Sequence, residues 1–152
     1  MITTEIRESL KTLLSGLQVG AVNDQIIFTK TVKEFMEKFG DTERTSTLQE
    51  VKGWFIACTD MSVARKKHID NTYKWVITGC VGLQEGSENA ILEMAEVVAD
   101  ALCEHPLLSA SGKCRAYIMS VSIPVRITVE EISGLLCHVA RLSFETGYRY
   151  AE

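Results

Sequence analysis

The side chains of this chain that could do nucleophilic or metal chemistry are its cysteines and histidines. They are Cys58, Cys80, Cys103, Cys114 and Cys137, and His68, His105 and His138, without a C-x-x-C pair among them. Cys103-x-His105 and Cys137-His138 could be imagined as metal ligands, but adjacent residues of a strand point to opposite faces, and structural zinc sites show clearer paired spacing. A Cys/His nucleophilic pair also needs an orienting group and an oxyanion pocket, and the sequence names neither. We therefore expect no metal, no cofactor and no enzymatic activity, and we interpret the cysteines as buried free thiols.

The glycine-rich segment Gly79–Ser87 superficially suggests a phosphate-binding loop, because it runs from an expected strand into an expected helix. It has no lysine in the place where a P-loop has one, and its glycine spacing fits neither common fingerprint. Glu85 and Glu88 would also repel a phosphate at the start of the helix. We expect a structural turn followed by a capped helix, with Ser87 as the N-cap residue.

One short segment concentrates positive charge, although the chain as a whole is acidic, with a formal net charge of -4. It consists of Arg65, Lys66, Lys67 and His68. One interpretation is a solvated hairpin tip, and the other is contact with an acidic surface of a neighbouring subunit or partner, where complementary charge fixes orientation. Glu130 and Glu131, in the expected turn of a second hairpin, could supply that acidic surface in a ring of identical subunits. These six residues are our candidate subunit or partner interface.

Length and composition favour one ordinary domain spanning residues 1–152, with 46% hydrophobic and 24% charged residues. The acidic balance argues against a dedicated nucleic-acid binder, whose affinity comes largely from Lys and Arg neutralising phosphates. No run approaches the roughly 20 apolar residues of a transmembrane helix, and the N-terminus lacks the apolar core of a signal peptide. We expect a protein made in the cytosol, without a membrane partner or nucleic-acid specificity.

Strict alternation of apolar residues is the strongest structural signal of the chain. The alternating positions are Tyr117, Met119, Val121, Ile123, Val125, Ile127 and Val129. This spacing predicts a long, half-buried strand, although Pro124 marks an edge position, a bulge or a bend, so the strand could be two shorter segments. A second alternation from Leu136 to Phe144 follows a possible turn at Glu130–Gly134. The C-terminal third is therefore interpreted as a long β-hairpin.

Helical and strand periodicities alternate through the rest of the chain. We expect helices at 4–17, 32–39 and 87–103, strands at 25–31, 51–59 and 72–83, and loops at 40–49 and 109–113. The strands at 51–59 and 72–83 read as an antiparallel hairpin. Together these elements predict an α+β domain: an antiparallel or mixed β-sheet packed on one face by amphipathic helices, with long β-hairpins.

The order of these elements resembles that of the tail terminator proteins of long-tailed bacteriophages, also called minor tail or tail-completion proteins. The resemblance covers most of the chain and concerns layout more than strict motifs. The residues that carry it are Ile6 and Leu10 in the first helix, the Trp54-Phe55 strand, the Arg/Lys-rich hairpin turn, Gly86-Ser87 before the apolar helix, and two long strands joined between Glu130 and Cys137-His138.

The resemblance implies a structural role, and it brings no catalytic residues. Such proteins form a ring, typically hexameric, that docks on the finished tail tube, stops its polymerisation and offers a surface for joining the head. The partners implied are further copies of the chain, the tail tube protein and the head-tail connector protein, with assembly in the bacterial host cytoplasm and a final place in the virion. The alternatives are another phage neck or tail adaptor protein, or a small cytosolic enzyme of unknown reaction.

Overall fold

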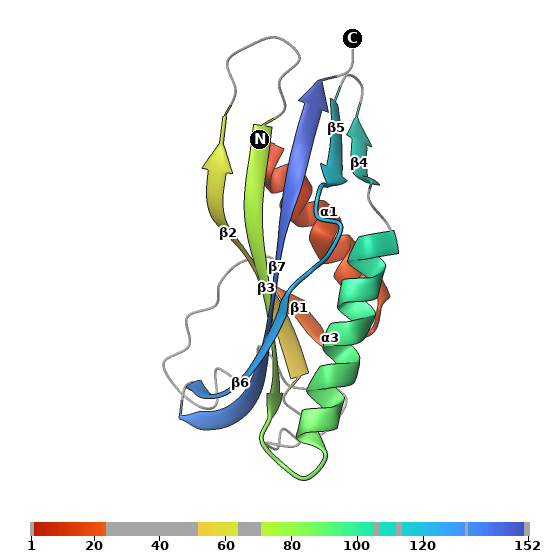
Figure 1. Cartoon of the computed structure of the whole chain (residues 1–152). Helices are drawn as coiled ribbons and strands as arrows, with labels where there is room; N and C mark the ends of the chain where they lie inside the picture. The colour runs from red at the N-terminus through yellow and green to blue at the C-terminus, as the bar shows by residue number, and fades with distance from the viewer. Residues whose placement is uncertain are drawn as a thin grey trace.

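The longest strand, β7 (Leu135–Tyr150), organises the sheet of this protein (Figure 1). The computed structural model describes residues 2–23, 52–63, 71–104, 107–111, 114–132 and 134–150. The other elements are α1 (Ile2–Gly16), β1 (Ala21–Asn23), β2 (Lys52–Ser62), β3 (Asn71–Gly82), α3 (Ser87–Glu104), β4 (Leu107–Ser111), β5 (Cys114–Ile118) and β6 (Val125–Ile132). The strand expected at 25–31, the helix at 32–39 and the loop at 40–49 lie outside the described residues.

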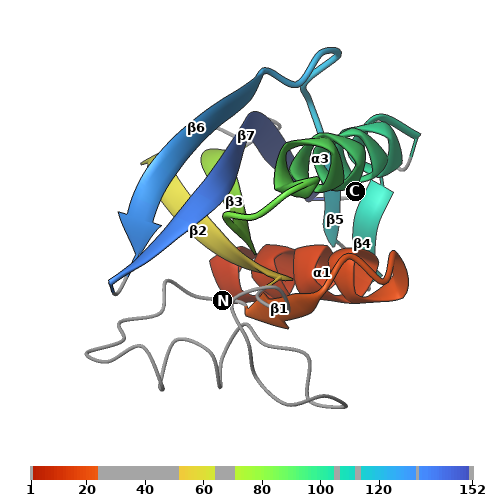
Figure 2. The ribbon, with the colours of Figure 1, turned by 90° about the horizontal axis from the view of Figure 1, so that it is seen from below.

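The strands form one mixed sheet in the order β1-β2-β3-β7-β5-β4, with β6 also paired to β7. Among the described pairings, that of the short β1 with β2 is parallel and the others are antiparallel. Viewed from below, the sheet is curled, with α3 close to its inner side and α1 across one end (Figure 2). The prediction of an α+β fold with a mixed sheet is confirmed, and so is the β2–β3 hairpin.

The helices form where apolar residues recur every three or four positions. In α1 the buried side chains are Ile6, Leu10 and Leu14, one on each successive turn. In α3 they include Ile91, Ala95, Val98 and Leu102, and Glu88 in the first turn favours the helix dipole. Both helices thus present one apolar stripe for packing against the sheet.

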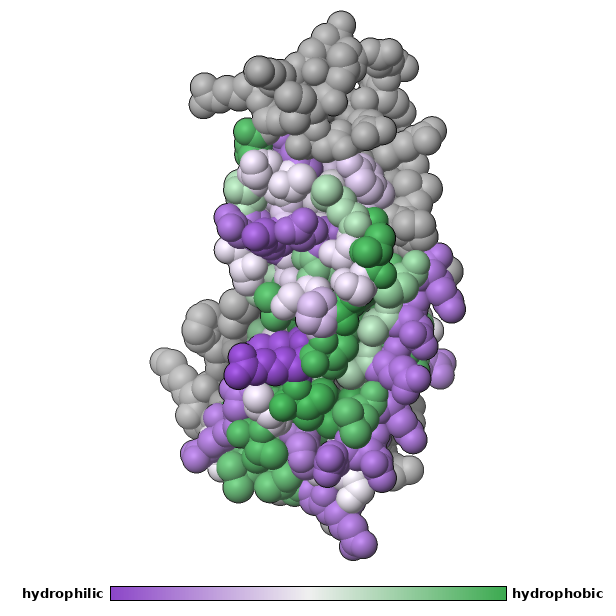
Figure 3. All heavy atoms as spheres, viewed as in Figure 1, coloured by the Kyte–Doolittle hydropathy of each residue, from purple (hydrophilic) through white to green (hydrophobic). Residues whose placement is uncertain are grey.

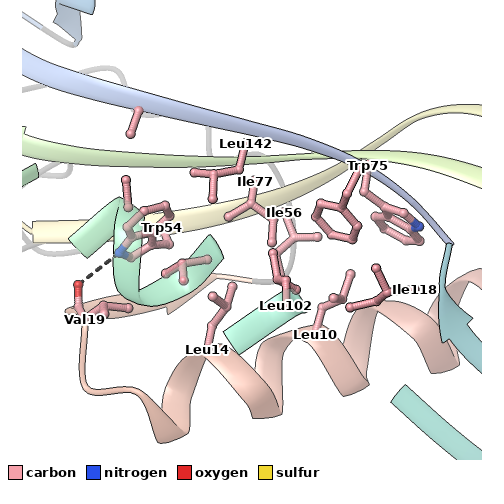
Figure 4. Close-up of a cluster of buried hydrophobic side chains, with 14 of the residues drawn as sticks. Leu10, Leu14, Val19, Trp54, Ile56, Trp75, Ile77, Leu102, Ile118 and Leu142 are labelled. Atoms are coloured by element: carbon pink, nitrogen blue, oxygen red, sulfur yellow. Dashed lines mark hydrogen bonds between the residues drawn. The ribbon is translucent and has the colours of Figure 1, made fainter. Parts of the chain in front are cut away.

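Two tryptophans occupy the centre of the core, where one hydrophobic cluster joins both helices to the sheet (Figure 4). Trp54 and Trp75 are both fully buried, so each indole N–H needs an internal partner. The Nε1 atom of Trp54 donates to the Val19 carbonyl oxygen at 3.0 Å, and that of Trp75 donates to the Thr146 hydroxyl at 2.8 Å. These bonds tie the chain after α1 to β2, and β3 to β7.

The alternating segment 117–129 belongs to two strands, β5 and β6, which is the alternative that Pro124 left open. β5 and β6 both pair with β7, but six residues of the connection, 119–124, face only three residues of β7, 143–145. The surplus reverses the side-chain alternation, because an odd shift moves each side chain to the other face. On the core face of β7, β5 therefore contributes Ala116 and Ile118, whereas β6 contributes Val125, Ile127 and Val129. The prediction of one continuous apolar face from 117 to 129 is wrong.

Segment 119–124 keeps partial hydrogen bonding to β7 in spite of the surplus residues. The Met119 N–H donates to the Glu145 carbonyl at 2.9 Å, and the Ser143 N–H donates to the Pro124 carbonyl at 3.3 Å. Between them, the Glu145 N–H donates to the Ser120 hydroxyl at 2.9 Å, where a regular ladder would offer a carbonyl oxygen. A side chain thus satisfies the backbone donor that the interruption would leave unpaired.

Two loop predictions are also wrong. Residues 109–111, expected in a loop, belong to β4, which pairs with β5. Glu130 and Glu131, expected in a turn, lie within β6, and the hairpin turns beyond Ile132, with Gly134 at a φ of 86° that favours glycine. The β6–β7 hairpin is therefore longer at its distal end than the sequence indicated.

A substitution at Gly79 tests the packing of Trp54. A Cβ atom at Gly79 would lie 2.6 Å from the Trp54 ring, which is fully buried and cannot move aside easily. We expect Gly79→Ala to lower the free energy of unfolding by about 1–3 kcal/mol through overpacking. Gly16→Ala is the matched control, because no atom lies within 4 Å of its added Cβ. Urea unfolding of both variants checks this, and equal stabilities would contradict the packing described.

Candidate functional site

The predicted interface residues fall in two parts of the chain. Arg65, Lys66, Lys67 and His68 lie outside the described residues. Glu130 and Glu131 are adjacent on β6, so their side chains point to opposite faces of the β6–β7 hairpin. Their chemical roles must therefore be considered separately.

Glu130 forms an ion pair with its own chain, across the hairpin. Its Oε1 atom accepts a hydrogen bond from Nη2 of Arg141 at 3.0 Å, while Oε2 accepts bonds from Nη1 of Arg141 and from the Thr128 hydroxyl. The hydrogen bonds from Arg141 and Thr128, with the charges of Arg141 and Arg126, lower the pKa of Glu130 to about 2. Glu130 is thus an ionised carboxylate that orders the hairpin.

Arg126 and Arg141 are site residues that sequence reasoning missed. They stand directly opposite each other on β6 and β7, and the single carboxylate of Glu130 lies near both. Like charges directly opposite on neighbouring strands repel. The face of the hairpin that carries Glu130 therefore has a local excess of positive charge.

The other face of the hairpin is apolar and open. Val125, Val129 and Leu136 have 40%, 53% and 49% of their surface exposed, and Glu131 is exposed beside them. Figure 3 shows hydrophobic surface gathered over β6 and between it and α3. Exposed apolar patches of this kind favour contact with another macromolecule.

Ser87 and His138 form the contact that most resembles a catalytic pair. The Ser87 hydroxyl lies 2.9 Å from His138 Nδ1. The same hydroxyl donates to the Gln84 carbonyl at 2.7 Å and accepts from the Gln84 N–H at 3.0 Å, and Ser87 is 1% exposed. The buried hydroxyl is thus held by two residues, Gln84 and His138, which indicates a structural role. The N–H of Ala90 donates to the Gly86 carbonyl oxygen, so the N-cap residue of α3 is Gly86. Ser87 therefore fastens the turn before α3 and is not its N-cap.

A shallow groove of about 350 Å³ opens beside the interruption between β5 and β6. Its lining includes Ser120, Ser122, Ser143 and the partly exposed pair of Lys74 and Glu145, whose charged atoms lie 3.8 Å apart. The lining hydroxyls and the single ion pair show no arrangement of nucleophile and base. In the described part of the chain, no group of three His, Cys, Asp or Glu side chains could hold a metal ion.

Cys80 and Cys137 lie in a second, smaller apolar cluster with Val139. These residues stand on alternate positions of β3 and β7, on the face of the sheet opposite the main core. Burial raises the pKa of the Cys80 thiol to about 12 and that of Cys137 to about 11. Both are therefore neutral thiols at ordinary pH, with little nucleophilic character.

Comparison with known proteins places the fold and gives no function. No family model matches this chain, and no curated protein matches it in sequence. A solved protein chain whose name states no function superimposes with a TM-score of 0.57 at 12% identity, covering 99% of this chain and 95% of its own length. At this identity the likeness shows a shared fold alone. Among the described helices, none is long and apolar enough to cross a membrane.

Acid titration tests the ion pair of Glu130. Because the pKa of Glu130 is lowered from 4.5 to about 2, its charge stabilises the folded state above pH 4.5, and that contribution is lost as the pH falls toward 2. Both side chains are more than one-third exposed, so we expect Glu130→Gln to cost only about 0.2–1 kcal/mol at pH 7. The loss should shrink below pH 4.5. Glu131→Gln, with the same charge change, should have a smaller effect in the same unfolding measurements; an equal effect would contradict the pairing.

Thiol reactivity tests the burial of Cys80 and Cys137, which was predicted; the prediction is wrong for Cys103, which is exposed. In the native protein at pH 8, we expect an aromatic disulfide reagent to modify the exposed Cys103 readily and to leave Cys80 and Cys137 unmodified, because they are buried and protonated. Mass spectrometry of the labelled peptides identifies the sites. Denaturant should expose both buried thiols, and rapid native labelling of Cys80 would show that the second cluster is open.

Proposed function

We propose that this chain is a structural virion protein similar to phage tail terminators, which forms a ring on the end of the tail tube. In this role the ring stops tube polymerisation and provides the surface that joins the tail to the head. Its partners are further copies of the chain, the tail tube protein and the head-tail connector protein. The protein acts by assembly and not by catalysis.

The observation that carries this proposal is the exposed apolar face of the β6–β7 hairpin. Figures 1 and 2 show the hairpin diverging from the two helices, so its distal half is available to another molecule. Val129 and Leu136 would lose exposed apolar surface there, which favours association by about 25 cal/mol for each Å² buried. A subunit that reaches its neighbour with an extended element can close a ring by repeating one contact around an axis.

Charge supports the same arrangement. Glu130 is already paired with Arg141, whereas Glu131 is exposed on the apolar face of the hairpin. Glu131 is therefore the acidic group that we assign to the contact with Arg65–His68 of a neighbouring subunit. Such a rim pair would set orientation and association rate more than affinity.

Leu136→Arg tests the assembly role. Leu136 is 49% exposed, so the charge should leave folding intact while opposing burial against a neighbour. We expect the wild-type protein, mixed with isolated tail tubes, to form terminal rings in negative-stain micrographs and to block further tube growth, and the variant to do neither. Leu92→Arg, at a 45% exposed position on α3, is the matched control and should still cap.

The location of the protein separates the terminator from the alternatives. Binding elsewhere in the neck or tail would favour another adaptor. No binding to any tail structure, by a folded wild-type protein, would refute the structural role.

A further inference from the structure

The outer edge of β6 has no strand partner within the part of the chain that the structure describes, where β6 pairs with β7 alone. The Ser143 N–H donates to the Pro124 carbonyl, so the backbone groups at position 124 point toward β7. Since these groups alternate along an antiparallel strand, those of Val125, Ile127, Val129 and Glu131 point away from β7. They form a template for another strand.

The sequence of this edge is complementary to itself. We propose that β6 pairs antiparallel with β6 of a second copy of this chain, around a two-fold axis at Thr128. In this register Arg126 faces Glu130 of the second copy, and Ile127 faces its Val129, each contact occurring twice. The pairs that exchange hydrogen bonds are then the outward-pointing residues, as an antiparallel ladder requires. Arg126 and Glu130 form the non-hydrogen-bonded pairs, in which side chains are closest.

Other registers lose this match. A shift of the partner by two residues in either direction places Arg126 opposite Thr128 or Ile132, without a charged partner. A further shift places Arg126 opposite Arg126, or Glu130 opposite Glu130, and like charges directly opposite are destabilising. A shift by one residue would pair outward-pointing groups with groups already bonded to β7. The charges therefore select one register.

The second copy also relieves a conflict within each chain. Arg126 stands opposite Arg141 of its own β7, and Glu130 is bonded to Arg141. The incoming Glu130 brings a second carboxylate beside Arg126. That carboxylate accepts two hydrogen bonds from its own Arg141 and one from Thr128, which leaves about one of its roughly four acceptor positions. On the other face, Val129, which is 53% exposed, becomes covered by Ile127 of the partner. Charge and apolar burial thus favour the same occupant, a copy of this chain.

This pairing is independent of the proposed ring. A two-fold contact uses the same patch on both subunits and closes after two, whereas a ring that presents different faces to tube and head repeats a heterologous contact. The β6 pair is therefore a dimer of free protein, separate from the assembled ring.

The test is sedimentation equilibrium of the full chain with amide hydrogen exchange by NMR. The wild-type protein should sediment at twice its 16.9 kDa at high concentration. In the dimer, the amides of Ile127, Val129 and Glu131 should become protected. The amides of Arg126, Thr128 and Glu130, bonded to β7, should be protected in monomer and dimer alike.

Two variants should weaken the dimer for different reasons. Arg126→Glu places like charges opposite each other twice and should weaken dimerisation about tenfold or more. Val129→Pro removes an outward N–H without touching the ladder to β7. Lys11→Glu, an exposed change on α1 with the same charge difference as Arg126→Glu, is the matched control and should remain dimeric.

Mixing gives the sharpest result. Arg126→Glu and Glu130→Lys chains should each be monomeric, yet together form a heterodimer, because both charged pairs are then complementary. Circular dichroism melting confirms that each variant is folded.

Three outcomes would overturn the inference: a wild-type monomer at about 1 mM, where even a weak complex is populated; a dimer whose Ile127 and Val129 amides stay unprotected; or a dimer unaffected by Arg126→Glu and Val129→Pro. The proposed function fails separately, when wild-type protein leaves tail tubes uncapped.

Discussion

The fold depends on β7 being paired along both edges. One edge is bonded to β3 from Cys137 to Tyr148, and the other is shared by β6 and β5. A strand held on both sides cannot slip, because a shift by one residue would move its core side chains to the opposite face. The registers of β3, β5 and β6 are therefore fixed relative to β7, and the buried hydrogen bond between Trp75 and Thr146 reinforces the β3–β7 register.

Because β5 and β6 share one edge of β7, the β6–β7 hairpin exposes apolar side chains. Segment 119–124 leaves β7 between β5 and β6, and the reversed alternation sends Val125, Ile127 and Val129 to the core side of the sheet. Of these three, Ile127 packs against the main core, whereas Val125 and Val129 remain exposed. With an alternation continuous from β5, these three residues would lie on the opposite face of the sheet, away from the helices. The interruption instead yields an apolar strand that is anchored by its partner and open to another molecule.

Local sequence signals predicted the elements of this chain better than their relations. Helical spacing located α1 and α3. Alternation predicted a strand over β6, and Pro124 allowed an interruption, but the predicted strand covered only the last two residues of β5 and ran through the break at 119–124. The reversal of faces was not predictable, because it depends on how many residues of β7 lie opposite the break, and that number is a tertiary property. For the same reason Glu130 could be chosen as a candidate but its partner could not. Arg141 is eleven positions away, and only the register of the hairpin brings the two together.

The charged residues at the edge of β6 affect pairing with an unrelated strand and pairing with a second copy of the chain in opposite ways. Proteins often guard exposed edges with charged residues, since an uncharged edge pairs indiscriminately. Here the charges stand at Arg126 and Glu130, flanking an uncharged Ile-Thr-Val centre, and Pro124 limits the ladder at one end. Against a strand of unrelated sequence these charges lose hydration without compensation, which discourages pairing. Against a second copy in one register each meets its opposite. The same two residues can thus exclude most partners and admit one, which is how an open edge can persist without leading to aggregation.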